Sequence, residues 1–259
     1  MNLSLIIPVY NSSDILAELI KEIEKNINHD YEIILVNDFS KDNSWETIKK
    51  ISKKNLNIKG LNLEKNYGQH NAIAAGLYYS SGKYIILMDD DLQHDPRYIN
   101  DILNELIKGY EACYVKYIKR KHKYWKKLVS QLNHLTSSFL SGKSLNIYTS
   151  SYKGFNRRIC DIIKNDSKKE VFLDWIILNN SKKTNSIQIL HRKRYSGTTN
   201  YNLNKLLLLW SSMIMSIKSK NIISKLIIDI LKFFIQHFLF KIIKKKIFNE
   251  KFLISGKTF

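Results

Sequence analysis

The sequence is poor in cysteine, proline and glycine, and it has no long hydrophobic run. Its two cysteines, Cys113 and Cys160, are too few for a framework of several disulfides or a four-thiolate zinc site, which favours a reducing compartment. Two prolines and nine glycines exclude collagen-like and linker-rich proteins. No stretch reaches the roughly 18 uninterrupted apolar residues of a clean transmembrane helix, and the first residues lack the features of a secretory signal.

The chain is rich in hydrophobic residues and in positive charge. Of its 259 residues, 44% are hydrophobic, enough to bury a core and to exclude wholesale disorder. Lysine and arginine number 42 against 23 aspartates and glutamates, a formal charge of +19. This excess predicts an anionic partner: a nucleic acid, a membrane surface or a phosphorylated substrate. Composition alone does not choose among the three.

Strand-like and helix-like patterns alternate along the first hundred residues. Short apolar runs predict strands at 3–9, 31–36, 58–63 and 84–88, and amphipathic or small-residue segments predict helices at 15–25, 45–51, 69–79 and 96–108. Such alternation is typical of an α/β fold with a mainly parallel sheet covered by helices on both faces. Polar clusters at 10–12, 37–40 and 89–93 follow predicted strands, so we expect them on one rim, where such sheets bind ligands.

Three consecutive carboxylates, Asp89, Asp90 and Asp91, follow the fourth predicted strand. Adjacent carboxylates repel one another unless a cation offsets their charge. Mg²⁺ and Mn²⁺ prefer oxygen ligands and often complete their coordination with substrate phosphates. A solvated acidic turn is the alternative interpretation, but the position behind a buried strand of a parallel sheet favours the metal site.

Two further positions at predicted strand ends have both a functional and a structural interpretation. An ionised Asp38 accepts hydrogen bonds only, so it suits the N–H edge of a nucleotide base, or it caps the helix at 45–51. Gly68 permits a positive φ or a close backbone approach, or it simply belongs to a turn.

Together these segments form an ordered set of motifs. They are PVYN at 8–11, VNDFSKD at 36–42, KNYGQ at 65–69 with AGL at 75–77, and MDDDLQ at 88–93. The set resembles the family 2 glycosyltransferases of the GT-A fold, and most closely the branch that contains the dolichyl- and undecaprenyl-phosphate sugar synthases. The resemblance extends from about residue 3 to about residue 209. It does not identify the sugar.

The resemblance implies a nucleotide-sugar donor, inversion at the anomeric carbon and a divalent metal, Mg²⁺ or Mn²⁺. Asp89 and Asp91 match the metal-binding positions, and Asp90 replaces a residue that is usually small. The other matched donor-binding positions are Pro8, Tyr10 and Asp38 for the nucleoside, Ser12 where the branch often has a carboxylate, and Gln93 near the diphosphate or the sugar.

The second half of the chain matches the family less fully. Residues 149–153 correspond to an acceptor-side segment, and residues 194–201 to a loop that usually carries Arg, Gly, Ser and Lys. Arg194 and Gly197 are present and the lysine is absent, so Lys193 or Lys205 is the candidate substitute. Arg194 and Lys116 are cations that would offset the charge of the nucleoside diphosphate leaving group, so Arg194 is predicted to be catalytic together with Asp91.

The acceptor decides whether a general base is needed. A polyprenyl phosphate is already anionic near neutral pH and needs none. A sugar hydroxyl needs one, and Asp174 is the leading candidate, with a capping or surface carboxylate as the alternative. His70 and His191 are interpreted as structural or supporting residues.

Two basic stretches bear on the partner. Seven lysines and arginines at 116–127 alternate with aromatic residues, which suits a solvated face or contact with phosphate or lipid headgroups. Nucleic acid is not the predicted partner, because no standard nucleic-acid-binding module is visible. Residues 221–248 form a lysine-rich amphipathic pattern, typical of a helix in a membrane interface or docked on the catalytic domain.

The sequence therefore predicts a GT-A-like catalytic domain at 1–209 and an amphipathic helical appendage at 210–259. We expect a peripheral enzyme on the cytoplasmic face of the membrane that transfers a sugar to polyprenyl phosphate or a lipid-linked glycan for the cell surface. The alternatives are transfer to a sugar hydroxyl in polysaccharide, O-antigen or capsule assembly, and a catalytically impaired protein that binds nucleotide sugars. A homo-oligomeric assembly stays open.

Overall fold

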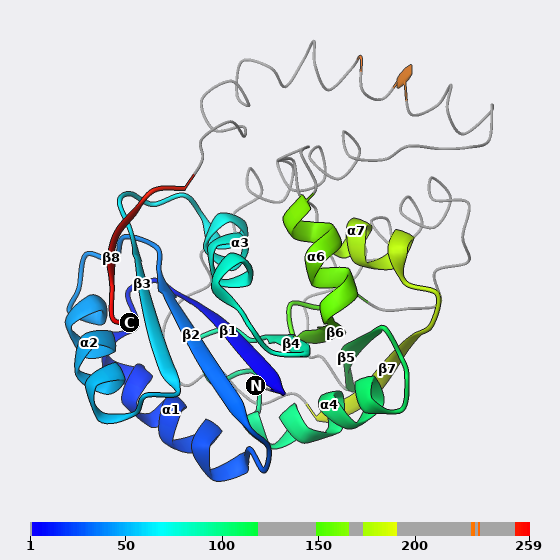
Figure 1. The fold of residues 1–259 in the computed structure, drawn as a ribbon, viewed down its shortest axis with the longest axis horizontal. Coiled ribbons are helices and arrows are strands. Elements are labelled where there is room, and N and C mark those ends of the chain that lie inside the picture. Colours follow the sequence, from blue (N-terminus) through cyan, green and yellow to red (C-terminus); the bar gives the residue numbers. More distant parts are fainter. Residues whose placement is uncertain (1, 119–148, 166–172, 191–228, 231–232, 234–251) are drawn as a thin grey trace.

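The structure is an α/β sandwich built on one eight-stranded sheet (Figure 1). It is a computed structural model that describes residues 2–118, 149–165, 173–190, 229–230, 233 and 252–259. The sheet is mixed and mainly parallel, as the sequence predicts.

Residues 3–107 alternate strands and helices in the predicted order. The elements are β1 (Leu3–Val9), α1 (Ser13–Asn26), β2 (Tyr31–Asn37), α2 (Ser44–Lys54), β3 (Ile58–Leu63), α3 (Gln69–Tyr79), β4 (Tyr84–Leu87), the 3-10 turn η1 (Pro96–Tyr98) and α4 (Ile99–Ile107). The predicted helix at 96–108 thus begins as a 3-10 turn, because Asp95 accepts a hydrogen bond from the Arg97 amide and Pro96 occupies the first turn.

The second half adds two strands inside the sheet and one at each edge. These elements are β5 (Ala112–Ile118), β6 (Lys153–Asn156), α6 (Arg157–Asn165), α7 (Leu173–Asn180), β7 (Thr184–Leu190) and β8 (Ile254–Lys257). The spatial order is β7-β5-β6-β4-β1-β2-β3-β8. Strands β4, β1, β2 and β3 are mutually parallel, and β6 and β8 run antiparallel to their neighbours.

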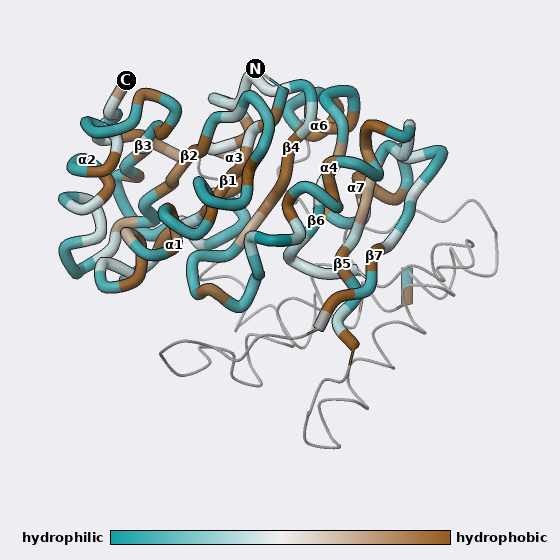
Figure 2. Tube along the Cα trace, turned by 90° about the horizontal axis from the view of Figure 1, so that it is seen from below, coloured by the Kyte–Doolittle hydropathy of each residue, from teal (hydrophilic) through white to brown (hydrophobic). Residues whose placement is uncertain are grey.

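Helices cover both faces of the sheet and divide the core in two. Helices α1, α2 and α4 pack with Leu5 and Ile7 of β1 on one face, whereas α3, α6 and α7 pack with Ile6 on the other. This division follows from the alternation of side chains along a strand, because both faces of β1 are covered and its residues are all buried. Figure 2 shows the hydrophobic residues gathered along the strands and the hydrophilic ones on the outer turns.

Helix α3 approaches the sheet closely, as its small residues predict. Ala72 and Ala75 are fully buried. A Cβ atom on Gly76 would lie 2.5 Å from Cγ2 of Ile6 and 3.2 Å from Cγ2 of Val36. Only glycine fits at this contact, which lets α3 pack closely on β1 and β2.

The last strand differs from the prediction. Residues 210–259 were expected to form a helical appendage, but residues 254–257 are a strand, β8, that pairs with β3 at the edge of the sheet. Residues 229–230 and 233 have helical backbone, and the rest of 210–251 lies outside the described residues, so the domain boundary after residue 209 stays a prediction. None of the helices in the described ranges combines the length and apolarity that crossing a membrane requires.

Glu32, a carboxylate of β2, is fully buried. Glu32 accepts hydrogen bonds from the Ser4 hydroxyl at 2.6 Å, from the Lys59 ammonium at 2.7 Å, and from the Ser81 amide and hydroxyl at 2.6 and 2.8 Å. Burial alone would raise the pKa of Glu32, but these donors outweigh it and lower the pKa from its usual 4.5 to about 2.

Because this pKa is depressed in the folded state, Glu32 stabilises the fold above pH 4.5 and this contribution disappears as the pH falls towards about 2. We expect Glu32→Gln to lower the free energy of unfolding by about 2 to 3 kcal/mol at pH 7 and to reduce its fall between pH 4.5 and 2. Urea unfolding at a series of pH values measures both effects. Glu46→Gln, which alters an exposed pair with Lys49, is the control and should change little. An unchanged pH dependence in Glu32→Gln would contradict this account.

Candidate active site

The carboxyl ends of β4, β1, β2 and β3 form one edge of the sheet, here called the carboxyl rim. The turns that follow these strands comprise residues 88–95, 10–12, 38–43 and 64–68. The Tyr10 amide donates to Asp90 at 3.1 Å, and the Asn11 amide donates to the Ser40 hydroxyl at 2.9 Å. These contacts confirm that the three polar clusters predicted from the sequence lie together.

Three of these turns contain a residue other than glycine in the left-handed region. Asn11 has φ 54° after β1, Phe39 has φ 57° after β2, and Leu92 has φ 59° after β4. This conformation is uncommon for phenylalanine and leucine and is kept only where the surroundings enforce it, which is typical of ligand-binding and catalytic sites. Gly68, with φ 85°, serves the same purpose after β3 without steric cost.

Asp38 is turned towards the loop between β3 and α3. Its two carboxylate oxygens accept hydrogen bonds from the Tyr67 amide at 2.7 Å and the Gly68 amide at 2.8 Å, and its carbonyl accepts from the Asn66 side chain. The alternative role as a cap of α2 is wrong, because that helix starts after Asn43. Burial raises the pKa of Asp38, although the two amides oppose this. The two amides occupy two of roughly four acceptor sites, so the carboxylate has capacity for a ligand.

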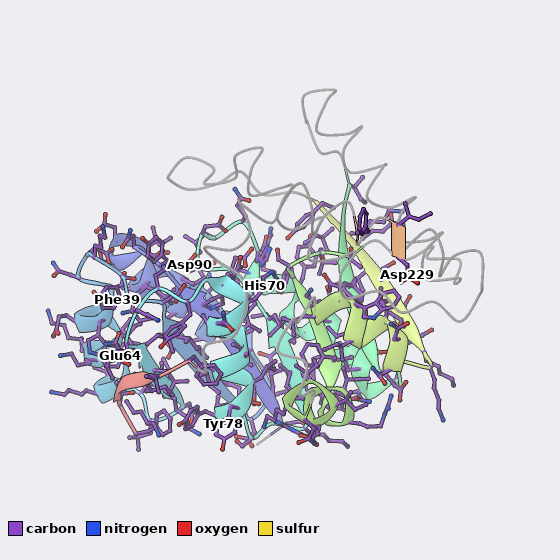
Figure 3. The ribbon with its side chains drawn as sticks, turned by 90° about the horizontal axis from the view of Figure 1, so that it is seen from above. Phe39, Glu64, His70, Tyr78, Asp90 and Asp229 are labelled. Carbon is purple, nitrogen blue, oxygen red and sulfur yellow. The ribbon has the colours of Figure 1, made fainter. Side chains whose placement is uncertain are left out.

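Asp90 faces inwards and ties two turns of the carboxyl rim together. Its carboxylate accepts from the Ser12 hydroxyl at 2.6 Å as well as from the Tyr10 amide. Burial raises its pKa to about 6 despite these donors, and the charges of Asp89 and Asp91 raise it further. Asp90, labelled in Figure 3, therefore belongs to the wall of the site. Ser12, where the branch often has a carboxylate, serves as its hydrogen-bond partner.

Asp89 is surrounded by donors from three segments. Its Oδ1 accepts from Gln69 Nε2 at 2.7 Å, at the start of α3, and its Oδ2 accepts from the Ser151 hydroxyl at 3.0 Å, just before β6. His94 Nε2 lies 3.3 Å from the same Oδ2. The second half of the chain therefore reaches the acidic triplet through residue 151, within the segment predicted to lie on the acceptor side.

His94 fixes this arrangement and was missed by the sequence analysis. Its Nδ1 accepts from the Asp89 amide at 2.9 Å, which requires a neutral ring with its proton on Nε2, facing Asp89 and the Ser151 hydroxyl at 3.1 Å. The ring stacks on Tyr152, with centroids 4.7 Å apart. Its position five residues after Asp89 was the only available signal, since nothing in the sequence shows that the turn folds back.

The donor set suits a hard cation that is completed by its ligand. Within the described ranges, no group of three or more His, Cys, Asp or Glu side chains is arranged to hold a metal ion. Asp89 and Asp91 would supply oxygen ligands, and Asp91 also orders the turn by accepting from the Gln93 amide at 3.1 Å. Two carboxylates fit the way Mg²⁺ binds with substrate phosphates, rather than a site made only of protein ligands.

Asp174 lies at the start of α7 and is not an isolated surface carboxylate. It forms an ion pair with Lys153 of β6, and the two side chains are only 16% and 7% exposed. Lys153 also lies 5.5 Å from the ring centroid of Tyr114. Burial lowers the pKa of His70, the Lys153 charge lowers it further, and Asp174 and Asp89 oppose both effects. Asp174 and Asp89 therefore both lie within electrostatic range of the His70 imidazole.

The remaining predicted residues are less closely connected to this site. Pro8 is buried in β1 and Tyr10 is exposed directly after it, beside the end of β2. Lys116 is exposed on β5, and none of the described contacts joins it to Asp89 or Asp38. Arg194 and the amphipathic segment 221–248 lie outside the described residues, apart from 229–230 and 233.

Because His94 holds both the backbone and the carboxylate of Asp89, we expect His94→Ala to weaken Mn²⁺ binding in the presence of a nucleoside diphosphate by about tenfold. Isothermal titration calorimetry measures this change. His29→Ala is the matched control, since His29 precedes β2 and therefore lies at the amino ends of the strands, away from the carboxyl rim. Equal Mn²⁺ affinity in the wild-type chain and His94→Ala would show that His94 does not orient Asp89.

Known proteins are similar in sequence to most of this chain. Residues 4–163 match the family model described as glycosyl transferase family 2. The chain is 29% identical over 208 residues to the uncharacterized glycosyltransferase YkcC of Bacillus subtilis and 30% identical over 215 residues to an undecaprenyl-phosphate 4-deoxy-4-formamido-L-arabinose transferase of Serratia proteamaculans. The alignments cover 79% and 82% of this chain but only 64% and 66% of those relatives.

A solved structure shares the fold. Glucosyl-3-phosphoglycerate synthase of Mycobacterium tuberculosis, crystallised with Mn²⁺, UDP-glucose and phosphoglyceric acid, superposes with a TM-score of 0.58 at 14% identity, covering 85% of this chain and 81% of that one. The sheet therefore has the GT-A fold, and the family match over more than half of the chain shows that the protein belongs to glycosyl transferase family 2.

Proposed function

We propose that this chain transfers a sugar, with inversion, from a nucleotide sugar to a polyprenyl phosphate at the cytoplasmic face of a membrane. The observation that carries the proposal is the carboxyl rim itself. Asp38, a buried carboxylate suited to a nucleotide base, and the acidic triplet Asp89–Asp91 with its surrounding donors lie on the two turns that flank the β1 turn at one sheet edge. A nucleoside and its diphosphate need these two kinds of contact side by side.

The nucleoside would bind beside Asp38. Its carboxylate is held by the Tyr67 and Gly68 amides and retains acceptor capacity for the N–H edge of a base. Pro8 and Tyr10 flank the same strand ends and would border the ring. The Mycobacterium structure was solved with UDP-glucose, which supports a uridine nucleotide as the first donor to test.

The diphosphate would lie against Asp89 and Asp91. A divalent ion bound there would offset the charge that develops on the leaving group. This chain's own residues orient that contact: Gln69, Ser151 and His94 hold the Asp89 carboxylate in place. Gln93, Lys116 and Arg194 are proposed to contact the diphosphate or the sugar.

The acceptor proposed here needs no general base. A phosphate monoester already carries negative charge near neutral pH, so its oxygen attacks the anomeric carbon directly and the nucleoside diphosphate leaves. The name of the Serratia relative supports this acceptor class. The positive charge of the chain and the lysine-rich pattern at 221–248 support attachment to an anionic membrane surface.

A sugar hydroxyl is the second candidate acceptor, and the placement of Asp174 favours it. The carboxylate is partly buried and lies within electrostatic range of His70, and a hydroxyl acceptor needs a base. The ion pair with Lys153 holds this carboxylate in place. A chain that binds donors without turnover is the remaining alternative.

Loss of the carboxylate at position 91 tests the reaction class. We expect Asp91→Asn to reduce metal-dependent release of nucleoside diphosphate by about 100-fold or more, because the leaving-group charge is then poorly offset. Release is measured with a panel of nucleotide sugars, Mg²⁺ or Mn²⁺ and undecaprenyl phosphate in anionic vesicles. Asp101→Asn, at an exposed position of α4, is the control. Equal turnover in Asp91→Asn and the wild-type chain would contradict the proposed metal site.

The two acceptors are separated by Asp174→Asn. With undecaprenyl phosphate in anionic vesicles as the acceptor, we expect the kcat of Asp174→Asn to lie within a few-fold of wild type. Co-sedimentation with the same vesicles at low and high salt measures membrane attachment. With a hydroxyl acceptor that uses Asp174 as base, kcat would fall about 100-fold or more and the acidic limb of the pH profile would disappear. Glu111→Gln, which breaks the ion pair with Arg158, controls for loss of a structural pair. A 100-fold loss with the phosphate acceptor would contradict the base-free mechanism.

A further inference from the structure

Strand β8 extends the sheet beyond β3, far along the chain from the rest of the catalytic fold. It pairs antiparallel to β3, with Leu61 opposite Lys257 and Leu63 opposite Ile254. At its far end the Gly60 amide donates to the Thr258 hydroxyl at 2.7 Å. Figures 1 and 3 show β8 along the outer edge of β3. Since β8 is antiparallel to β3, its first residues lie at the carboxyl rim.

At that rim, residues just before β8 bind the loop between β3 and α3. The Leu253 carbonyl accepts from the Glu64 amide at 2.9 Å, and the Leu253 amide donates to the Tyr67 hydroxyl at 3.1 Å. Figure 3 shows Glu64 next to the edge strand. The loop 64–68 is therefore held at both of its ends by the same short segment of chain.

The same loop orients Asp38. Tyr67 contacts Leu253, the residue before β8, through its hydroxyl and Asp38 through its backbone amide. One residue thus joins the edge-strand segment to the proposed nucleoside site. Because Gly68 has φ 85° and Asp38 is buried, the loop must be held in a single conformation for both amides to reach the carboxylate.

A second route connects β8 to the turn after β2. The Asn62 side chain donates to the Ser255 hydroxyl at 2.9 Å and accepts from the Asn37 side chain at 2.6 Å. Asn37 in turn accepts from the Ser40 amide at 3.3 Å. The loop 64–68 and the turn after β2, which contains Asp38, are thus both connected to the edge strand by hydrogen bonds.

We propose that β8 and Leu253 act as a positioning element for donor binding, by holding the loop 64–68 so that Asp38 is preorganised for the nucleoside. The inference rests on the proposed function. Its physical basis is that a loop already ordered in the free protein loses little conformational entropy on binding, so binding is tighter. Donor affinity then depends on residues more than 180 positions away from Asp38 in the sequence.

The minimal test is Tyr67→Phe, which removes the hydroxyl that accepts from Leu253 but keeps the ring and the amide that binds Asp38. We expect about threefold weaker binding of the nucleoside diphosphate that the wild-type chain prefers among UDP, GDP, CDP, ADP and dTDP with Mg²⁺. Deleting residues 252–259 should weaken it about tenfold or more. Phe259→Ala, which removes a ring contact with Tyr79 at the other end of β8, is the matched control and should bind like wild type.

Hydrogen exchange of the amides in the 64–68 loop gives a readout independent of the nucleotide. We expect faster exchange at Tyr67 and Gly68 in Tyr67→Phe and in the deletion, and wild-type exchange in Phe259→Ala. The role of β8 would be overturned by two results together. Tyr67→Phe would show wild-type nucleotide affinity and wild-type amide exchange, and a folded deletion variant would bind the nucleotide as tightly as wild type or more tightly. If the deletion does not fold, Tyr67→Phe alone decides. A wild-type chain that binds none of the five nucleotides would instead overturn the proposed function.

Discussion

Parallel pairing of β4, β1, β2 and β3 is the constraint on which the rest of this structure depends. It brings four turns to one edge, and each neighbouring pair of turns is then joined by a side chain: Asp90 joins the β4 and β1 turns, Asn11 the β1 and β2 turns, and Asp38 the β2 and β3 turns. Tyr67 continues the series to β8. These links continue from turn to turn across the sheet, so each turn is held by its neighbours.

The acidic triplet shows how neighbouring carboxylates divide their tasks. Burial is the main cause of the raised pKa of Asp90, and repulsion from the neighbouring charges of Asp89 and Asp91 adds to it. Asp90 offsets part of this rise by accepting two hydrogen bonds in the wall of the site. Asp89 is instead held by neutral donors and by His94, which leaves its charge available to a cation. The acidic triplet therefore combines a structural carboxylate, Asp90, with a carboxylate suited to ligand binding, Asp89.

The two edges of the sheet also have a consequence for function. Strand β7 ends at the carboxyl rim, because it is parallel to β5, and β8 begins there, because it is antiparallel to β3. The chain thus leaves the sheet at one edge and returns at the other, both times on the side of the proposed donor site. Segment 191–251, which includes Arg194 and the basic amphipathic pattern, is joined to the catalytic fold at these two points.

Sequence patterns predicted most of the fold because strand and helix periodicity is local. The first four strands, the helices between them and the gathering of polar clusters on one rim follow from residues close in the chain. β8 could not be predicted this way: ISGK at 254–257 is too short and too polar to show periodicity, and it becomes a strand only because β3 offers an open edge. Similarly, nothing local distinguished the base-binding and helix-capping interpretations of Asp38.

By itself, then, the sequence determined the family, the α/β alternation and the identity of the carboxylates that could bind a donor. Tertiary structure alone decided that Asp90 lies in the wall of the site, that His94 accepts from the Asp89 amide, and that Asp174 is paired with Lys153. The reason is physical: a side chain's residue type and spacing are properties of the chain, but its hydrogen-bond partner and its burial depend on segments that only folding brings together.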